Sequence, residues 1–466
     1  MLVSLRFAFA GDVYAIKLKM YEYFIYEQLK KYERANKSFH VPGHKARGDF
    51  KLKFPVAGID VTELSYSDNL FCPAGVIANA QRDIAQILGA RKSYIVTGGS
   101  SSGVLTMLYV ASKRGNKLIV PRNSHQSVWN ACKLFGVEPV IVQGEEKDGI
   151  ILPPSPEHIE GLVENDVNIA GMIVAQPDYY GNEAPLSAYY SILHSYNRLL
   201  IVDGAHGSHL AFEPERKGYA GVYADMWVDG VHKSLPVLTQ GAVVSVNNQN
   251  LVPEVEEALC CFRTTSPSYP VMASAEYGIK YIANNPRLVT EAKAAVKTFK
   301  EKAHGFTFYP SDDWTKLIID FKPLGISSDA AAEFLEKRGV YAELSDGRYL
   351  LFYLSPMTKP RDLSALNLAL NRLRENKKLA GSYKESLPFP KNERTYSFQF
   401  ALKHKREYVP LKDSEGRMCA VNVGITPPCI PVVAAGEIVS KEAVAVLSGG
   451  KSTFGIVGGK IPVVKK

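Results

Sequence analysis

Apolar positions along the chain follow two alternating patterns. Short apolar runs, which are typical of buried strands, occur in SYIVT (93–97), KLIVP (117–121), EPVIV (138–142), AGMIVA (170–175) and RLLIV (198–202). The intervening segments are long enough for helices, and residues 76–88 and 104–112 carry apolar residues at helical spacing. Strands that alternate with helices predict an α/β domain with a mostly parallel sheet, covered by helices on both faces.

The same patterns divide the chain into four parts. Helical spacing over residues 271–284 and 286–304 is followed by a shorter α/β pattern and then by a charged linker. We expect an N-terminal extension and helix at 1–37, a large domain at 38–289, a small α/β domain at 290–378, and a Pro- and Gly-rich α+β domain at 385–466. Residues 1–19 have no clear pattern, and the first helix is expected at about 20–35.

Composition narrows the class of protein. The chain has 466 residues, of which 46% are hydrophobic and 22% charged, as in ordinary globular proteins. Its net charge of +8 is spread along the chain, which argues against a nucleic-acid-binding protein. The six cysteines form no CxxC pair and no metal-ligand spacing with histidines, so we expect neither a disulfide nor a bound metal. No apolar run approaches the ~20 residues of a transmembrane helix, and the N-terminal segment is a poor signal peptide; we therefore expect a cytoplasmic protein.

Lys233 is the first candidate for chemistry. A lysine amine acts as a nucleophile near neutral pH only when its pKa is lowered, which an apolar setting favours. Lys233 directly follows His232. The other residues nearby are apolar: Trp227, Val228, Val231 and Leu235. The segment is typical of an imine-forming lysine, and a solvated surface lysine is the alternative when the segment is taken alone.

A turn rich in glycine and serine, residues 98–103, lies between an expected strand and an expected helix. Free backbone N–H groups and the helix dipole make such a turn a cradle for phosphate. An ordinary flexible turn is the alternative. The turn is not a dinucleotide-binding GxGxxG motif.

Polar side chains follow the expected strands at their carboxyl ends, where parallel sheets place their chemistry. They include His125, Asp178, Asp203 and His206. Asp203 either caps a helix or holds a cationic ring nitrogen, and His125 is either a loop residue or an aromatic plate against a flat cofactor. An anion cradle, a flat ring partner, a buried acid and an amine, in this order, are together what pyridoxal phosphate requires.

Nine stretches of the chain carry a family resemblance. They are SFHVPGHK (38–45), DVTELSYSDNL (60–70), TGGSSSGV (97–104), RNSHQSV (122–128), DYYG (178–181), VDGAHGSHLAF (202–212), DGVHKSLPVLTQGA (229–242), TTSPSYPVMAS (264–274) and TPPCIPVVAAGE (426–437). In these stretches the chain resembles the Orn/Lys/Arg decarboxylase family in its short, Gram-positive-like form. The resemblance implies the aspartate aminotransferase-like fold (fold type I) of pyridoxal-phosphate-dependent enzymes.

The resemblance also implies how the cofactor ring is held. Lys233 would bind the cofactor covalently as an imine, and Asp203 would pair with the pyridinium nitrogen and keep it protonated. His125 would stack on one face of the ring, with Ala205 on the other. His206 would lie near the phenolic oxygen and the substrate carboxylate.

By the same resemblance, Ser100, Ser101 and His232 would hold the phosphate of the cofactor. Thr265 and Ser266 resemble the segment that reaches the phosphate of a neighbouring subunit, which implies a homodimer as the smallest active unit. One position departs from the family pattern. Members often have a hydroxyl residue two places before the His-Lys pair, whereas this chain has Gly230.

The activity that the resemblance implies is the decarboxylation of arginine, lysine or ornithine to the corresponding amine, as a step of polyamine metabolism. Lys233, His232 and His206 are the expected catalytic residues. Lys233 or His232 would return a proton to the α-carbon.

The distal cation of such a substrate needs an acidic partner. Glu343 and Asp346 are the candidates, with Asp312 and Asp313 near Trp314 as further ones. Glu343 is favoured because it resembles an acidic residue that follows the same strand in the family. Acids that are merely solvated on loops are the alternative for each.

Two other functions fit the same fold. An aminotransferase would need an arginine to grip the α-carboxylate, and Arg263 or Arg348 are the residues available; release of CO2 against formation of a keto acid separates the two reactions. A catalytically silent, cofactor-binding regulatory protein is the other alternative, and Gly230 is its only support in the sequence.

Overall fold

The computed structural model describes residues 2–6, 15–33, 38, 40–385, 387–426, 429–450 and 452–465. Three residues of the matched stretches, Phe39, Pro427 and Pro428, lie outside the described residues. Among the described residues, no helix is both long enough and apolar enough to cross a lipid bilayer.

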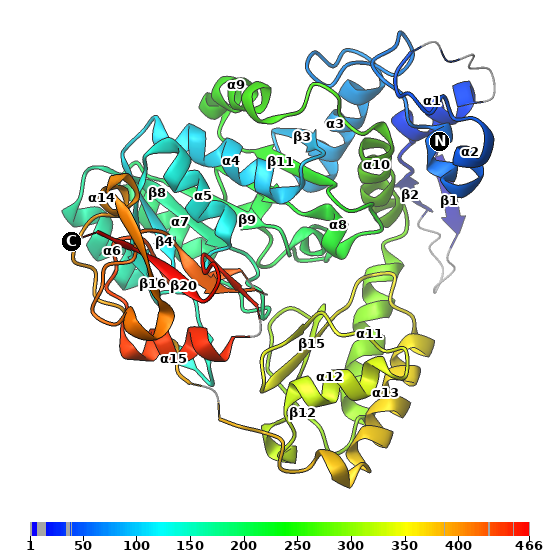
Figure 1. Ribbon diagram of the computed structural model, residues 1–466. Coiled ribbons are helices and arrows are strands. Elements are labelled where there is room, and N and C mark those ends of the chain that lie inside the picture. The colour runs from blue at the N-terminus through cyan, green and yellow to red at the C-terminus, as the bar shows by residue number, and fades with distance from the viewer. Residues whose placement is uncertain are drawn as a thin grey trace.

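A seven-stranded sheet forms the centre of the molecule (Figure 1). Its strands are, in spatial order, β3 (Lys92–Val96), β11 (Ala242–Val246), β10 (Met226–Asp229), β9 (Leu199–Gly204), β8 (Ile169–Ala175), β4 (Lys117–Pro121) and β5 (Glu138–Val142). All neighbours are parallel except β11, which runs antiparallel to both β3 and β10. The prediction of a mostly parallel sheet is therefore confirmed.

Helices cover both faces of this sheet. One face carries α3 (Val76–Leu88), α6 (Pro156–Asn165), α7 (Leu186–Ser195) and α10 (Tyr269–Asn284), and the other α4 (Gly99–Ser112), α5 (Gln126–Phe135) and α9 (Val252–Phe262). Side chains of a strand point alternately to the two faces. In β9, Leu200 and Val202 accordingly belong to one apolar core and Leu199 and Ile201 to the other, which explains the uninterrupted apolar run in the sequence.

A smaller antiparallel sheet follows the long helix α11 (Arg287–Lys302). Its strands are, in spatial order, β12 (Thr307–Phe308), β13 (Lys316–Asp320), β15 (Tyr349–Tyr353) and β14 (Leu344–Ser345). Helices α12 (Ser328–Glu336) and α13 (Pro360–Arg374) pack with α11 on this sheet. This unit lies below the large sheet in Figure 1.

The C-terminal part of the chain folds back beside β4 and β5 (Figure 1). It contains the helices α14 (Phe398–Lys403) and α15 (Lys441–Gly449), and the strands β16 (Arg406–Pro410), β17 (Val423–Ile425), β18 (Ile430–Val433), β19 (Thr453–Phe454) and β20 (Lys460–Val464). The ion pair between Arg122 and Glu437 joins it to the large domain, with side chains only 5% and 2% exposed. Phe398 packs beside Trp129 at the same seam.

The N-terminal segment contains more structure than its sequence predicts. Strands β1 (Leu2–Arg6) and β2 (Ala15–Lys19) pair antiparallel, although residues 1–19 show no clear pattern. Helices α1 (Phe24–Glu33) and α2 (Gly48–Lys53) follow. Buried Glu276 of α10 accepts hydrogen bonds from the backbone N–H groups of Phe24 and Ile25, at 2.6 and 2.7 Å, and so caps the start of α1.

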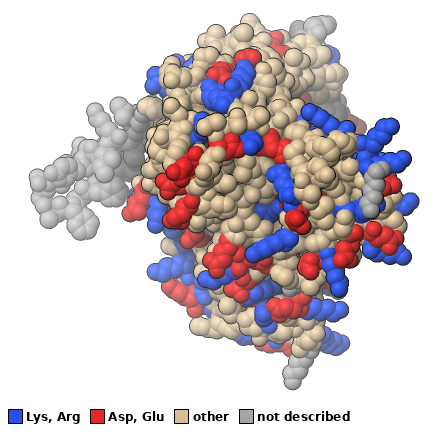
Figure 2. Space-filling view, turned by 90° about the vertical axis from the view of Figure 1, so that its left-hand side faces the viewer, with Lys and Arg blue, Asp and Glu red and all other residues tan. Residues whose placement is uncertain are grey.

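Three further short elements belong to the large domain: β6 (Glu146–Lys147) pairs with β7 (Ile150–Ile151), and α8 (Val231–Ser234) follows β10. Figure 2 shows one face of the molecule, on which basic and acidic side chains are interspersed. On this face the net charge of +8 is not gathered into one patch.

Candidate functional site

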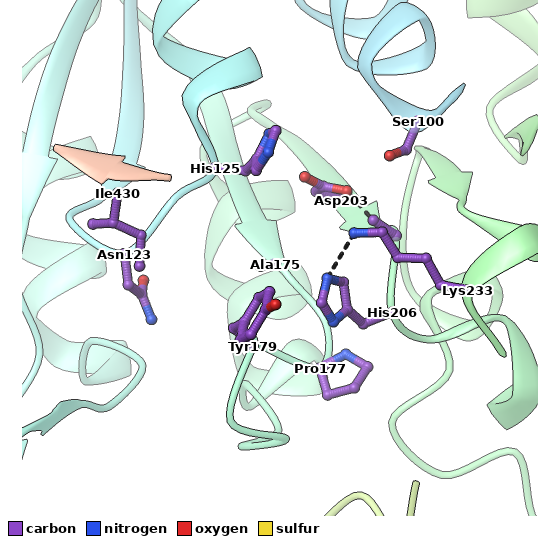
Figure 3. Close-up of a pocket in the computed structure, with 11 residues that line it drawn as sticks. Ser100, Asn123, His125, Ala175, Pro177, Tyr179, Asp203, His206, Lys233 and Ile430 are labelled. Carbon is purple, nitrogen blue, oxygen red and sulfur yellow. Dashed lines mark hydrogen bonds between the residues drawn. The ribbon is translucent and has the colours of Figure 1, made fainter. Parts of the chain in front are cut away.

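A pocket lies at the carboxyl ends of the parallel strands (Figure 3). The residues that line it are Ser100, Asn123, His125, Ala175, Pro177, Tyr179, Asp203, Ala205, His206, Lys233 and Ile430. Those from the large domain follow β3, β4, β8, β9 and β10, while Ile430 begins β18 of the C-terminal part. The topology of the sheet thus brings together residues that are far apart in the sequence.

Lys233 is held on the single helical turn of α8, directly after β10. Its Nζ lies 2.9 Å from Nε2 of His206 (Figure 3). Burial lowers the pKa of Lys233, and the nearby carboxylate of Asp203 acts in the opposite direction. The partly buried amine is therefore easier to deprotonate than a surface lysine, as a nucleophile at this position requires.

His206 is neutral at pH 7. Burial and the neighbouring Lys233 hold the pKa of its imidazole well below the usual range. With Lys233 as the donor, Nε2 accepts the hydrogen bond and the imidazole proton is assigned to Nδ1. In the part of the chain that the structure describes, this buried Nδ1 has no hydrogen-bond partner, so it is available to a bound group.

Asp203 and His125 line the same pocket as Lys233. Asp203 is the last residue but one of the buried strand β9 and is 6% exposed, and its Oδ1 accepts a hydrogen bond from the N–H of Ala205 at 3.2 Å. His125 is the N-cap residue of α5, where its Nδ1 accepts from the N–H of Ser127. Figure 3 shows the carboxylate of Asp203 between His125 and Lys233.

The three residues expected to hold a phosphate differ in position. Ser100 lies in the first turn of α4 and lines the pocket, beside the free N–H groups of that helix. Ser101 is exposed and lies outside the lining. His232 also lies outside it, because its Nδ1 is hydrogen-bonded to the carbonyl oxygen of Gly241 at 2.9 Å.

The close packing around position 230 explains why the residue there is glycine. A Cβ atom at this position would lie 2.5 Å from the carbonyl oxygen and 3.0 Å from the Cα of Ala205. Real Cβ atoms essentially never approach so closely, so the turn before Lys233 needs glycine in order to pack on the loop after β9. A serine at this position would therefore require the loop at Ala205 to move.

Thr265 and Ser266 lie on the exposed segment between α9 and α10, away from the pocket lining. The N–H of Ser266 donates to Oγ1 of Thr264. If Thr265 and Ser266 contact a cofactor, that cofactor is therefore not in the pocket of their own chain.

The acids of the small domain do not line the pocket themselves. Glu343 accepts a hydrogen bond from the hydroxyl of Tyr179 at 3.0 Å, and Asp346 from that of Tyr180 at 2.8 Å. Asp313 is fully buried and engaged with His209, on the large domain, and with Lys316.

Sequence reasoning gave no role to Tyr179, Asn123 and Ile430, which line the pocket. A signal existed, because Asn123 lies in the matched stretch 122–128, Tyr179 in 178–181 and Ile430 in 426–437.

The pocket fits pyridoxal phosphate. It offers an amine of lowered pKa, a buried carboxylate, a flat imidazole at its wall and a serine at a helix N-terminus, on Lys233, Asp203, His125 and Ser100. The unpartnered Nδ1 of His206 adds a hydrogen-bond donor. These are the groups that an aldehyde, a pyridinium nitrogen, an aromatic ring, a phosphate and a phenolic oxygen need.

Comparison with known proteins identifies the family. The model of the Orn/Lys/Arg decarboxylase major domain matches residues 24–310, and that of the Orn/Lys/Arg decarboxylase C-terminal domain matches residues 377–448. An uncharacterized protein of Bacillus subtilis (strain 168) is 30% identical over 454 residues, with 91% of this chain and 93% of the relative covered. The arginine decarboxylase of Halalkalibacterium halodurans is 30% identical, covering 87% of this chain and 89% of its own.

Solved structures share the fold. The lysine decarboxylase of Francisella novicida superposes with a TM-score of 0.81 at 19% identity, over 95% of this chain and 81% of its own. The constitutive lysine decarboxylase of E. coli gives 0.78 at 20% identity, over 95% and 82%. The chain therefore belongs to the Orn/Lys/Arg decarboxylase family of pyridoxal-phosphate-dependent decarboxylases, and it has their aspartate aminotransferase-like fold type I.

Proposed function

We propose that this chain removes the α-carboxylate of a basic amino acid, with arginine as the first candidate. The observation that carries the proposal is the pocket in which the amine of Lys233 meets His206 beside the carboxylate of Asp203. The arginine decarboxylases among the relatives are 28–30% identical to this chain, against 22–23% for the lysine decarboxylases. The product would then be agmatine, a precursor of polyamines; lysine and ornithine would give cadaverine and putrescine.

The pocket residues expected from the sequence each have a task in this proposal. When bound, pyridoxal phosphate supplies an electron sink that weakens the bond between the α-carbon and its carboxylate. Lys233 holds the cofactor, Asp203 keeps its ring nitrogen protonated, and Ser100 binds its phosphate at the N-terminus of α4. His125 and Ala205, which both line the pocket, would hold the two faces of the ring.

The proton that replaces CO2 comes from Lys233 in this proposal. Its Nζ reaches the pocket, whereas His232 is turned to the carbonyl oxygen of Gly241. The neutral imidazole of His206 accepts a hydrogen bond from Nζ and orients it. Its Nδ1–H is left to hold an anionic oxygen of the cofactor or substrate.

We further propose a cytoplasmic homodimer. The exposed position of Thr265 and Ser266, off the pocket of their own chain, supports a role at a neighbouring subunit's phosphate. The expected turn at 98–103 is mostly the first part of helix α4, which begins at Gly99. Ser101, on this helix, and His232 stay proposed phosphate ligands only if the start of α4 and the loop at 238–241 rearrange when the cofactor binds. The division into the domains 1–37, 38–289, 290–378 and 385–466 is part of the same proposal.

Incubation of the purified, cofactor-loaded protein with each of arginine, lysine and ornithine tests this function. We expect CO2 and the corresponding amine in equal amounts. We expect the highest kcat/KM for arginine, because the chain is more similar to the arginine decarboxylases than to the lysine decarboxylases. The measurement is mass spectrometry of the amine together with the CO2 released. Keto-acid formation without CO2 would indicate an aminotransferase, and a yellow protein that is inert to all three would indicate a silent binding protein.

A further inference from the structure

The aromatic residue Tyr179 joins the pocket to the small domain. It lies on the turn after β8, and its ring lines the pocket with the centroid 5.1 Å from that of His206 (Figure 3). Its hydroxyl donates a hydrogen bond to Oε1 of Glu343, just before β14, at 3.0 Å. Tyr179 therefore stands between the cavity and the carboxylate of Glu343, which does not line the pocket itself.

The next residue makes the same kind of contact without facing the cavity. The hydroxyl of Tyr180 donates to Oδ2 of Asp346 at 2.8 Å, and its ring packs against Tyr349 of β15, with centroids 6.3 Å apart. Tyr180 is absent from the pocket lining. Two tyrosine–carboxylate contacts thus span the same pair of domains, and they differ in whether they border the pocket.

The protonation state of Tyr179 is well defined. Burial, followed by the negative charge of Glu343, raises the pKa of its hydroxyl far above the usual range. The phenol therefore keeps its proton at neutral pH and donates a hydrogen bond to Glu343, and its oxygen retains a lone pair that can accept a further hydrogen bond. A neutral phenol polarised by a carboxylate is a good acceptor for a cation, and its ring face attracts cations as well.

The surroundings of Tyr179 favour a positively charged group over an anion. Glu343 also attracts Lys233 and Lys316, so its negative field extends into the site. Lys316 is fully buried and already paired with Asp313, whereas the hydrogen bond from Tyr179 leaves Glu343 with one carboxylate oxygen to spare. A cation on the end of an amino-acid side chain would supply the missing positive charge.

We propose that Tyr179 is a specificity-determining residue: its phenol holds the carboxylate of Glu343 at the pocket wall, and the two together bind the distal cation of the substrate. This inference rests on the proposed function and names the contact that selects basic over neutral side chains. Tyr180 and Asp346, the second tyrosine–carboxylate pair, hold the domains together and take no part in selection.

The variant Tyr179→Phe keeps the ring and removes the hydrogen bond to Glu343, and Tyr180→Phe makes the same change beside it. We expect Tyr179→Phe to raise KM for arginine about 10-fold or more, since a hydrogen bond to a charged group is worth that much, with a far smaller effect on kcat. Glu343→Gln should do the same, and none of the three should change the absorbance of the bound cofactor. Tyr180→Phe should change KM less than about 3-fold.

Amine binding separates this inference from the proposed function. Agmatine carries the distal cation and no carboxylate, and hexylamine is similar in length and lacks that cation. Calorimetry of both amines with the cofactor-loaded protein needs no turnover. We expect the preference for agmatine to fall about 10-fold or more in Tyr179→Phe and to be unchanged in Tyr180→Phe. An unchanged preference in Tyr179→Phe would overturn the inference even if CO2 is released, whereas a lost preference would uphold it even if no CO2 is released.

Discussion

At the scale of single residues, the active-site turn is set by steric fit as much as by chemistry. In the sequence, Gly230 replaces a hydroxyl residue that members of the family often have at this position. In the structure, the same glycine lets the turn before Lys233 pack on the loop that follows Asp203, with 2.5 Å between a would-be Cβ and the oxygen of Ala205. The spacing of the amine from the acid thus depends on this contact.

Restoring the hydroxyl should therefore harm the site. We expect Gly230→Ser to weaken cofactor binding about 10-fold and to lower the free energy of unfolding by about 1–3 kcal/mol, because overpacking displaces the loop at Ala205. Titration of the cofactor-free protein with pyridoxal phosphate measures the affinity. Gly161→Ser is the control, since nothing lies within 4 Å of a Cβ there. Tighter binding in Gly230→Ser would show that the hydroxyl is accommodated and useful.

The sequence could identify part of the site at this scale. Lys233, Asp203, His125, His206, Ser100 and Ala205 do line one pocket. Residue types and motifs located them because each follows a recognisable strand. The orientation of a side chain is not encoded in this way. The hydrogen bond of His232 to Gly241 depends on loop geometry, and the outward position of Ser101 depends on where helix α4 begins and how it is rotated, which only the folded chain reveals.

At the scale of secondary-structure elements, the prediction succeeds where burial imposes a pattern. The central strands are buried on both faces, so their apolar runs are plain in the sequence. The pair of β1 and β2 and the helix α13 were not foreseen. Helix α13 does carry buried apolar residues at helical spacing, at Leu363, Leu366 and Leu370, so the sequence held a pattern for it that was missed. The two strands of the pair are only five residues long each, which leaves too few positions for a clear pattern.

A buried ion pair joins the large domain to the C-terminal part, in addition to the less buried pair of Arg394 with Glu138. Nη1 of Arg122 donates to Oε2 of Glu437 at 3.0 Å, its Nη2 donates to the other oxygen, and the N–H of Ala434 donates to Oε2 as well. A carboxylate that is buried without its partner costs far more than the pair itself contributes. The docking of the C-terminal part should therefore be sensitive to either residue.

We expect Arg122→Met to lower the free energy of unfolding by about 3–5 kcal/mol, and the further change Glu437→Gln to recover much of that loss, because it removes the unpaired charge. Urea denaturation followed by fluorescence measures both. Lys92→Met is the control: its pair with Glu256 is 50% and 47% exposed, and the change should stay within about 1 kcal/mol. A loss below 1 kcal/mol in Arg122→Met would mean that the seam is held by other contacts.

At the scale of the whole molecule, three parts of the chain meet at one pocket. The large domain supplies most of the lining, the C-terminal part adds Ile430, and the small domain adds Glu343 through Tyr179. Local patterns in the sequence could divide the chain into such parts. How the parts touch is set by their packing, which is why Tyr179 and Ile430 were not expected at the site.

The central claim is that Lys233, among all lysines of the chain, holds the cofactor. Reduction of the cofactor-loaded protein with borohydride fixes the cofactor on its lysine, and peptide mass spectrometry then locates it. Lys316 provides an internal comparison, because it too is buried with a lowered pKa but is engaged with Asp313. We predict one pyridoxyl group per chain, on the peptide that contains Lys233; a label on Lys316 or elsewhere, or none at all, would contradict the account.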